Sequence, residues 1–207
     1  MLSHKLLLKS GYISQLSAGI FSFTPMGWRV ISNIKKIIDD EMKKINCFES
    51  NLPVIQPSDI WKQSGRIDSF IPPLANFQDR RDKKMIIAPT HEEAVIDLVK
   101  NYLRSFRDLP FSLYHIQTKF RDETRPRGGL LRVREFEMKD AYSFHADEKS
   151  LDETFEKFSE AYFNIFKRCG LNVVKVAADS GAIGGKVSSE FVSLSDSGED
   201  TILMCDS

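Results

Sequence analysis

Residues 119–139 have the sequence KFRDETRPRGGLLRVREFEMK, and this stretch decides the fold because it describes a hairpin. A Pro-Arg-Gly-Gly turn lies at 126–129. Its two glycines supply the φ freedom that a tight reversal needs, and Pro126 fixes φ just before them. The flanking segments 114–121 and 130–138 are each able to form a strand. We therefore predict an antiparallel hairpin with arginines at its base and tip.

The hairpin is basic, with six basic residues against two acidic ones between positions 119 and 134. Guanidinium groups on a rigid hairpin suit polyanions, because each presents a planar fork of donors that matches phosphate or carboxylate oxygens two at a time. A solvated salt-bridge lattice without any ligand is the alternative interpretation of such a charge run. The basic residues are Lys119, Arg121, Arg125, Arg127, Arg132 and Arg134, and the acidic ones are Asp122 and Glu123.

The order of residues in the hairpin favours the ligand-binding interpretation. Phe-Arg-Asp-Glu at 120–123, a loop, and Arg-Val-Arg-Glu-Phe at 132–136 resemble motif 2 of the class II aminoacyl-tRNA synthetases, F-R-x-E, a loop, then R-x-x-x-F. The longer run FRDETRPRGGLLRVREFEMKDAYSF is similar to the prolyl-tRNA synthetases of bacterial type. The resemblance implies an α+β fold, an antiparallel sheet flanked by helices. Residues 1–207 would then form an incomplete catalytic core that carries motifs 1 and 2.

The resemblance implies a role for each residue of motif 2. Arg121 would be the catalytic residue, holding the α-phosphate of ATP and the carboxylate of the amino acid. Glu123 would accept a hydrogen bond from the adenine amino group, and Arg132 would reach the β- and γ-phosphates. Phe136 would stack on the adenine, and Leu131 would complete the ATP site. An arginine that neutralises charge on the α-phosphate and an aromatic platform for a base both make chemical sense.

A second group of candidate residues lies upstream. Residues 84–88 (KMIIA) predict a compact strand, and Thr90-His91-Glu92-Glu93 begins a helix in which Thr90 and Glu93 form a capping box. The resemblance offers another interpretation, the T-x-E signature of prolyl-tRNA synthetases, in which Thr90 and Glu92 bind the imino group of proline. A secondary ammonium needs a carboxylate and an acceptor in fixed positions, so these residue types suit the task. His91 receives no role.

The ring of proline requires an apolar slot beside Arg121 and the imino-binding pair. By the resemblance, the strand after the motif 2 loop lines this slot, which places Met138, Asp140 and Tyr142 near the substrate. Only the side chains of Met138 and Tyr142 suggest such a role chemically, and both residue types are equally typical of an ordinary core.

The N-terminal third is predicted to be helical. A short helix over 3–10 ends at Gly11, and a second helix begins at Pro25. The run 47–55 resembles a strand but contains Pro53, which indicates a sheet edge or an interruption of the ladder. A long helix followed by such a strand resembles motif 1, the dimer-forming element of class II synthetases, with Pro53 at the dimer interface. From the residues alone, the apolar stripe of the helix is core: Val30, Ile34, Ile37, Ile38, Glu41, Met42 and Ile45.

Shorter elements fill the rest of the chain. We expect a short helix over 58–64, a hairpin of 77–80 with 84–88, a long amphipathic helix that stops at Gly170, and a strand over 172–178.

The C-terminal segment, from about 180–207, leads by the resemblance toward an editing insertion that is absent here. Its glycine-rich run 179–185 lacks the spacing of a phosphate loop, so a turn between two strands is expected. Ser189 departs from the family pattern, which usually has histidine before Glu-Phe. Because no motif 3 follows, we expect a piece of a longer synthetase that is inactive by itself.

Gross composition is consistent with a globular enzyme core. The 207 residues are 42% hydrophobic and 28% charged, as expected for one domain with a sizeable core. With 29 basic and 29 acidic residues, any contact with tRNA must be local. Three widely spaced cysteines form neither a disulfide framework nor a metal motif, which suits a cytoplasmic location. We identify neither a signal peptide nor a membrane-spanning run.

The resemblance therefore implies a proline–tRNA ligase that makes prolyl-adenylate from proline and ATP and then transfers the prolyl group to tRNA(Pro). A homodimer is expected, and Mg2+ would bridge the ATP phosphates, although the sequence offers no dedicated acidic pair for a metal. Two rival hypotheses keep the fold without the catalysis. One is a synthetase-like paralogue that binds tRNA or another partner. The other is an amino-acid sensor that retains Thr90 and Glu92 and dispenses with the ATP residues.

Overall fold

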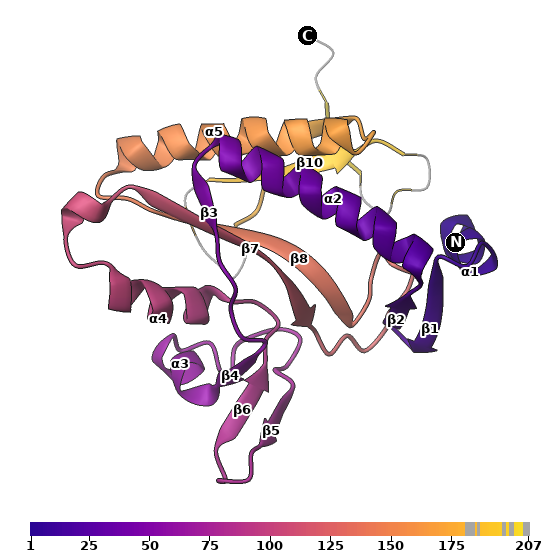
Figure 1. Cartoon of the computed structure of the whole chain (residues 1–207), viewed down its shortest axis with the longest axis horizontal. Coiled ribbons are helices and arrows are strands. Elements are labelled where there is room, and N and C mark those ends of the chain that lie inside the picture. The colour runs from indigo at the N-terminus through magenta and orange to yellow at the C-terminus, as the bar shows by residue number, and fades with distance from the viewer. Residues whose placement is uncertain (181–184, 186, 196–197, 199–200, 205–207) are drawn as a thin grey trace.

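The computed structural model describes residues 1–180, 185, 187–195, 198 and 201–204. Within these residues a three-stranded sheet, in the order β3-β7-β8, lies between helices (Figure 1). Helices α2 and α5 cover one face of the sheet and α4 lies beneath the other. The bounds of these elements are α2 Pro25–Lys44, β3 Cys47–Glu49, α4 Glu92–Tyr102, β7 Phe111–Phe120, β8 Glu135–Phe144 and α5 Glu148–Arg168.

The central hairpin that the sequence predicts is confirmed, with one shift in its boundaries. Strands β7 and β8 pair in antiparallel fashion over their full lengths, with Phe111 opposite Phe144 and Phe120 opposite Glu135. The second strand was expected over 130–138, but it begins five residues later. The hairpin is therefore longer at its base than predicted, and a loop separates the two strands.

This loop spans residues 121–134 and folds back on itself before β8 begins. Arg127 and Arg132 form an isolated antiparallel bridge, in which their amides donate to each other's carbonyls at 3.0 and 3.1 Å. Gly128 and Gly129 make the reversal at φ values of 69° and 67°, where a side chain would be strained. The predicted Gly-Gly turn is correct, but it closes this small inner hairpin.

Helices α2 and α5 bury one face of the sheet. Thr24 caps α2, with its hydroxyl accepting from the Gly27 amide at 3.3 Å, and Pro25 occupies the first turn as expected. The Tyr114 hydroxyl of β7 donates to Asp39 of α2, which ties the helix to the sheet. The buried centre of this layer consists of Met42, Cys47, Tyr114, Ala161 and Ile165.

The opposite face of the sheet packs against α4. Because side chains alternate along a strand, the residues of β7 and β8 that face α4 are the ones that turn away from α2 and α5. Val95 and Val99 of α4 are buried with Leu52, and partly buried side chains of both strands pack against them: Phe111, Leu113, Tyr142 and Phe144.

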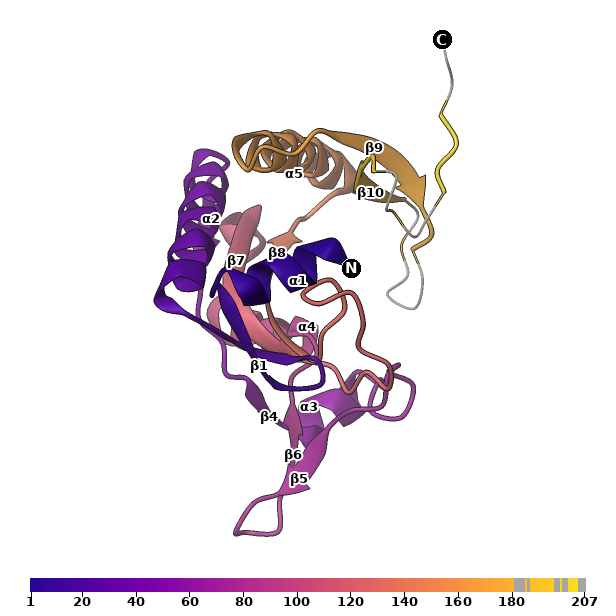
Figure 2. The same cartoon turned by 90° about the vertical axis from the view of Figure 1, so that its right-hand side faces the viewer.

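Smaller elements surround this core, and they are visible below and beside it in Figure 2. One end carries α1 and the β1–β2 hairpin, whose Gly19 carbonyl accepts from the Arg134 amide at 2.8 Å. A second sheet, in the order β4-β6-β5, lies beside α3, whose buried Trp61 donates to Gln56 at 2.8 Å. The bounds are α1 Leu2–Lys9, β1 Ile13–Ser17, β2 Ile20–Phe23, β4 Ile55–Pro57, α3 Ser58–Gln63, β5 Asn76–Gln78, β6 Lys84–Ile87, the 3-10 helix η1 Phe106–Asp108, β9 Val173–Ala178 and β10 Ser188–Ser193.

The strand expected over 47–55 is divided between two sheets. Its first part, β3, pairs with β7 in parallel, and its last residue begins β4, which pairs with β6. Pro53 is exposed in the connection, where its missing N–H interrupts no ladder. Of the two alternatives that the sequence left open, interruption is correct. The place of Pro53 in a dimer interface stays a prediction.

The C-terminal part confirms the strand over 172–178, since β9 pairs with β10 along six residues of each strand. The turn expected over 179–185 falls largely on 181–184, which lie outside the described residues. Cys205 also lies outside them, while Cys47 and Cys169 are free thiols. Within the described part of the chain, no helix combines the length and the apolar character needed to cross a bilayer.

Gly27, in the first turn of α2, allows the packing of this helix against the backbone of Tyr12 to be tested. A Cβ at this position would lie 2.1 Å from the backbone oxygen of Tyr12, far inside van der Waals contact. Gly27→Ala should therefore lower the free energy of unfolding by about 1–3 kcal/mol, although alanine is the better helix former. Urea unfolding measures the change. Asn33→Ala, at an exposed position of the same helix, is the control, and stabilisation by Gly27→Ala would contradict the packing.

Candidate functional site

A cavity of about 480 Å³ opens where the start of α4, the end of β7, strand β8 and the segment 66–71 meet. All six side chains that the sequence assigned to proline line it: Thr90, Glu92, Arg121, Met138, Asp140 and Tyr142. Residues from three separate parts of the chain are thus brought together around one space. Their individual roles stay predictions.

Backbone hydrogen bonds fix the segment that precedes α4. The Ala88 amide donates to Val54 at 2.8 Å, and the Ala88 carbonyl accepts from the amide of Phe120 at 3.0 Å. The Gln56 side chain donates to the Thr90 carbonyl at 3.5 Å. These bonds tie Thr90 to the β4 region on one side and to the end of β7 on the other, so its hydroxyl is held at the cavity wall.

Thr90 and Glu92 form a pair within the cavity wall. The Thr90 hydroxyl donates to Oε2 of Glu92 at 2.5 Å, and the Arg66 guanidinium lies 3.4 Å from the same oxygen. The predicted capping box is wrong, because the N-cap of α4 is His91 and no side chain caps this end. Glu93 instead accepts from Ser64 at 2.9 Å and from Arg66 at 3.1 Å.

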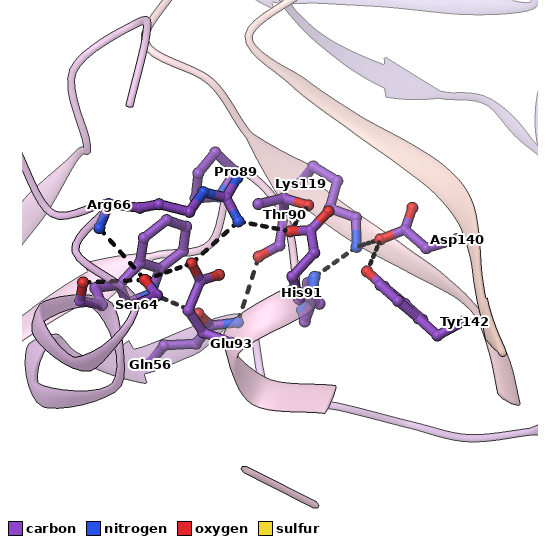
Figure 3. A network of polar contacts seen from close by, with 12 residues as sticks. Gln56, Ser64, Arg66, Pro89, Thr90, His91, Glu93, Lys119, Asp140 and Tyr142 are labelled. Atoms are coloured by element: carbon purple, nitrogen blue, oxygen red, sulfur yellow. Dashed lines mark hydrogen bonds and ion pairs between the residues drawn. The ribbon is translucent and has the colours of Figure 1, made fainter. Parts of the chain in front are cut away.

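A fully buried ammonium group lies behind the cavity wall. The Nζ atom of Lys119 is 2.5 Å from Nδ1 of His91 and 2.7 Å from Oδ2 of Asp140 (Figure 3). It is also 2.9 Å from Nε2 of His115. An ammonium has three donors and no acceptor, so its protons match these three atoms. His91 then accepts through Nδ1 and is protonated on Nε2. Nε2 of His115 also lies 3.1 Å from Oδ2 of Asp140, so this nitrogen either accepts from Lys119 or donates to Asp140, depending on the tautomer.

Burial and charge shift the pKa values in this cluster in opposite directions. Burial alone would raise the pKa of the Asp140 carboxyl, but hydrogen bonding from His115 and Lys119 lowers it to about 2. Burial, reinforced by the charge of Lys119, lowers the pKa of His91 to about 4. Burial also lowers the pKa of Lys119, against the opposing attraction of Asp140.

Tyr142 completes the polar wall. Its hydroxyl donates to Oδ2 of Asp140 at 3.0 Å. Burial, together with the charges of Asp140 and Glu92, raises the pKa of the phenol above its ordinary value. Tyr142 therefore remains a hydrogen-bond donor at neutral pH, with its ring presented to the cavity.

Among the described residues, one group of three could hold a metal ion, because ligand atoms of His91, His115 and Asp140 lie within 4.8 Å of one another. The ammonium of Lys119 already lies within 3 Å of each of them. The cluster is therefore organised around a lysine and does not fit a metal ion.

The loop residues assigned to ATP lie beside the cavity. Arg121 donates from Nε to the Pro89 carbonyl at 3.3 Å, and its guanidinium carbon lies 5.4 Å from the centre of the Phe136 ring. Arg132 donates to Glu123 at 2.8 Å. Leu131 is 72% exposed in the loop, away from the cavity lining.

Some of the charge run does form a salt-bridge lattice, since Asp122 pairs with Arg134 and Glu123 with Arg132. The two interpretations of the basic hairpin therefore coexist. Two of its arginines hold the loop together, while Arg121 faces the cavity from the end of β7.

Sequence reasoning missed three kinds of residue at this site. Lys119 was counted only among the basic residues of the hairpin. It lies two residues before Arg121 and four after His115, and side chains at such even spacings along a strand share one face of the sheet. His91 was left without a role. Arg66 lies in a segment without periodicity, so nothing local marked it as a neighbour of Glu92.

The arrangement can bind a zwitterion with an apolar body. An acceptor pair, Thr90 and Glu92, suits an ammonium, and the Arg121 guanidinium suits a carboxylate. Between them Met138 and the ring of Tyr142 offer apolar surface. This combination is typical of an amino-acid site.

Comparison with known proteins agrees with this description. A family model described as tRNA synthetase class II core domain (G, H, P, S and T) matches residues 76–203. The chain is 54% identical over 204 residues to a proline–tRNA ligase of Dehalococcoides mccartyi and 50% identical over 202 residues to one of Pediococcus pentosaceus. These matches cover 99% and 98% of this chain but only 36% and 35% of the relatives, so the chain spans little more than a third of their length.

Two solved structures are similar in fold. The prolyl-tRNA synthetase of Giardia lamblia in complex with prolyl-adenylate gives a TM-score of 0.77 at 21% identity, covering 84% of this chain and 36% of that one. The prolyl-tRNA synthetase of Cryptosporidium parvum, complexed with halofuginone and AMPPNP, gives a TM-score of 0.81 at 19% identity. The match covers 90% of this chain and 40% of that one. The predicted α+β architecture and the resemblance to prolyl-tRNA synthetases are thereby confirmed.

The buried His91 ring should make stability depend on pH. Its pKa is lowered to about 4 in the folded chain, against an ordinary value of 6.5, so between these values the unfolded chain binds a proton that the folded chain does not. The free energy of unfolding should therefore rise by up to about 3 kcal/mol from pH 4 to 6.5 through this residue. Urea unfolding at both ends of this range measures the rise.

His91→Asn keeps an acceptor near the position of Nδ1 but cannot titrate, so it should lose most of this rise. His145→Asn, which removes a histidine outside the cluster, is the matched control. Equal pH dependence in the wild-type chain and in His91→Asn would show that His91 is not held neutral by its surroundings.

Proposed function

The chain belongs to the tRNA synthetase class II core domain family, and we propose that it supplies the prolyl-adenylate site of a proline–tRNA ligase. One observation carries the proposal: a single cavity gathers a threonine–glutamate pair, an arginine and apolar side chains, which are the kinds of group that can bind the imino group, the carboxylate and the ring of proline. The names of the relatives, all proline–tRNA ligases at 50% identity or more, support the same substrate.

In the proposed first step, a carboxylate oxygen of proline attacks the α-phosphorus of ATP. The bond from that phosphorus to the bridging oxygen breaks, and pyrophosphate leaves. Glu92 and Thr90 hold the imino group, and Arg121 lies where it can bind the carboxylate and neutralise charge on the α-phosphate. Catalysis is then positioning and charge stabilisation, without a covalent enzyme intermediate. In the second step, the prolyl group passes to the terminal ribose of tRNA(Pro) and AMP is released.

ATP is proposed to lie along the loop beside the cavity. Phe136 provides the aromatic platform for adenine, and Glu123 accepts from the base and also holds Arg132, which would reach the β- and γ-phosphates. Leu131 is proposed to close over the nucleotide from the exposed end of the loop.

Mg2+ is the ion that ATP chemistry usually requires. The acids of this loop, Asp122 and Glu123, are each paired with an arginine, so the described residues do not fit a metal of their own. We therefore propose that Mg2+ enters with the nucleotide.

A homodimer and a cytoplasmic location are further parts of the proposal. Helix α2 carries several large apolar side chains on its surface, which suits a subunit contact. Among them, Trp28 is 48% exposed to solvent and Val30 is 45% exposed. Pro53, exposed after β3, would lie at the same contact. The segment 180–207 is proposed to lead toward an editing insertion.

The proposed substrate can be tested on this 207-residue chain by isothermal titration calorimetry. A non-hydrolysable prolyl-adenylate analogue, prolyl-sulfamoyl-adenosine, should bind at least about tenfold more tightly than its alanyl counterpart, because only the prolyl ring fills the slot. Equal binding of the two compounds would contradict a site specific for proline, while the proposed binding of the nucleotide part would still stand. No binding of either would contradict a preformed site.

Two substitutions test whether Glu92 and Arg121 contact the amino acid or only support the fold. Glu92→Gln removes the charge that holds the imino group and should weaken the prolyl compound by at least about tenfold, with Asp97→Asn, elsewhere on α4, as the control. Arg121→Ala should weaken it by a similar factor or more, with Arg125→Ala in the same loop as the control. Circular dichroism confirms that each variant is folded. Unchanged affinity in Arg121→Ala would refute its assignment.

A further inference from the structure

The most unusual group beside the cavity is the ammonium of Lys119, which is fully buried in the sheet. Burying a cation is costly unless it is paired and fully hydrogen-bonded. The Lys119 ammonium lies within hydrogen-bonding distance of a carboxylate oxygen and of one ring nitrogen from each of two histidines. These three polar partners offset the cost of burying it.

The choice of partners determines the charge of the cluster. His91 and His115 contact Lys119 without contributing negative charge, because an imidazole ring carries none in either tautomer. Asp140 is then the single anion and Lys119 the single cation. The cluster as a whole is neutral, although one of its members faces the substrate cavity.

We propose that Lys119 is the internal counter-cation of the amino-acid site, and that it makes the site select a ring that carries no positive charge. Lys119 is thus a positioning and specificity residue, which touches no substrate and acts through Asp140. This inference rests on the proposed function, because it concerns the same cavity, but it adds a residue and a selectivity that the resemblance does not assign.

The position of Asp140 carries the argument. Its Oδ2 atom contacts Lys119, Tyr142 and, at 3.1 Å, Nε2 of His115, while its Oδ1 atom is buried with no hydrogen-bond partner among the described residues. Because Asp140 lines the cavity, its negative charge would attract cations there unless a neighbouring group balanced it. Lys119 lies 2.7 Å from that carboxylate and cancels its charge at the cavity wall.

Glu92 is then left as the acid that recognises a substrate ammonium. It faces the cavity with Thr90 on one oxygen, and Arg66, 3.4 Å from that oxygen, is shared with Glu93, to which it lies closer at 3.1 Å. With Asp140 neutralised, the site offers one anionic anchor, which matches the single ammonium of an imino acid. Without Lys119 it would offer two, and a ring bearing a second ammonium would be favoured.

Other charged groups near Lys119 leave this balance intact. Arg121, two residues along β7, lies nearby and lowers the pKa of Lys119, while Glu92 at the start of α4 raises it; both act less strongly than Asp140. Their effects on the ammonium are opposite in sign. Asp140 therefore remains the dominant partner of Lys119.

The test compares two ligands in four forms of the 207-residue chain by calorimetry at about pH 8, where an ordinary histidine is neutral. The ligands are prolyl-sulfamoyl-adenosine and its 4-aminoprolyl counterpart, which adds an ammonium to the ring. Lys119→Met removes the cation at similar volume. Lys139→Met is the matched control, because Lys139 is a partly buried lysine of β8 that bonds Tyr162 on the opposite face of the sheet.

The wild-type chain and Lys139→Met should prefer the prolyl compound to the same extent. Lys119→Met should shift the ratio of the two affinities by at least about tenfold toward the aminoprolyl compound. Removing the anion as well, in Lys119→Met/Asp140→Asn, should return the ratio toward the wild-type value. A merely structural role for Lys119 would weaken both ligands together and leave the ratio unchanged, which would overturn the proposal.

A second measurement needs no ligand. Carbon NMR of aspartate-labelled chain, with Asp140→Asn to assign the signal, should give a pKa of about 2 for Asp140 in the wild-type chain and a clearly higher value in Lys119→Met. An unmoved pKa would overturn the counter-cation role even if prolyl-sulfamoyl-adenosine binds. If the wild-type chain binds neither compound but the pKa of Asp140 rises in Lys119→Met as expected, the proposed function and the selectivity are overturned. The ion pair between Lys119 and Asp140 is then still supported.

Discussion

The antiparallel register of β7 and β8 is the constraint on which the rest of the molecule depends. Pairing His115 with Asp140 and Lys119 with Phe136 places the polar residues that the sheet contributes to the cavity wall on one of its faces. A shift of one residue would turn these side chains toward α2 and α5 and bring Tyr114 out of the core. The inner hairpin of the loop, closed by Gly128 and Gly129, lies between the two strands that hold this register.

The cavity combines this sheet face with a second, less regular support. Thr90 and Glu92 come from the start of α4, which is held by hydrogen bonds to the β4 region and to the end of β7. The two supports meet at Lys119, whose ammonium bonds His91 before α4 and Asp140 on β8. One buried cation thus links the element that would hold the imino group with the strand that would hold the ring. Charge selection and mechanical support are properties of the same contact.

The sequence was sufficient for the parts of the structure that local chemistry specifies. Pro25 was expected to begin α2 and does so. The family resemblance placed Met138, Asp140 and Tyr142 beside the substrate, and all three line one cavity. It failed where the outcome depends on distant partners. Thr90 was expected to cap α4, but its hydroxyl bonds Glu92, and the burial of Lys119 depends on His91, which is 28 residues away. No local pattern reveals such contacts.

The most direct test of the account is to map the binding face itself. Amide NMR of the 207-residue chain, titrated with prolyl-sulfamoyl-adenosine, should give its largest shifts around the cavity, at Thr90, Arg121 and Asp140. Amides of α5 around Tyr162, on the other side of the same sheet, should move little. Shifts concentrated on α5, or no shifts with excess compound, would contradict the claim that the α4 face of this sheet is an amino-acid site.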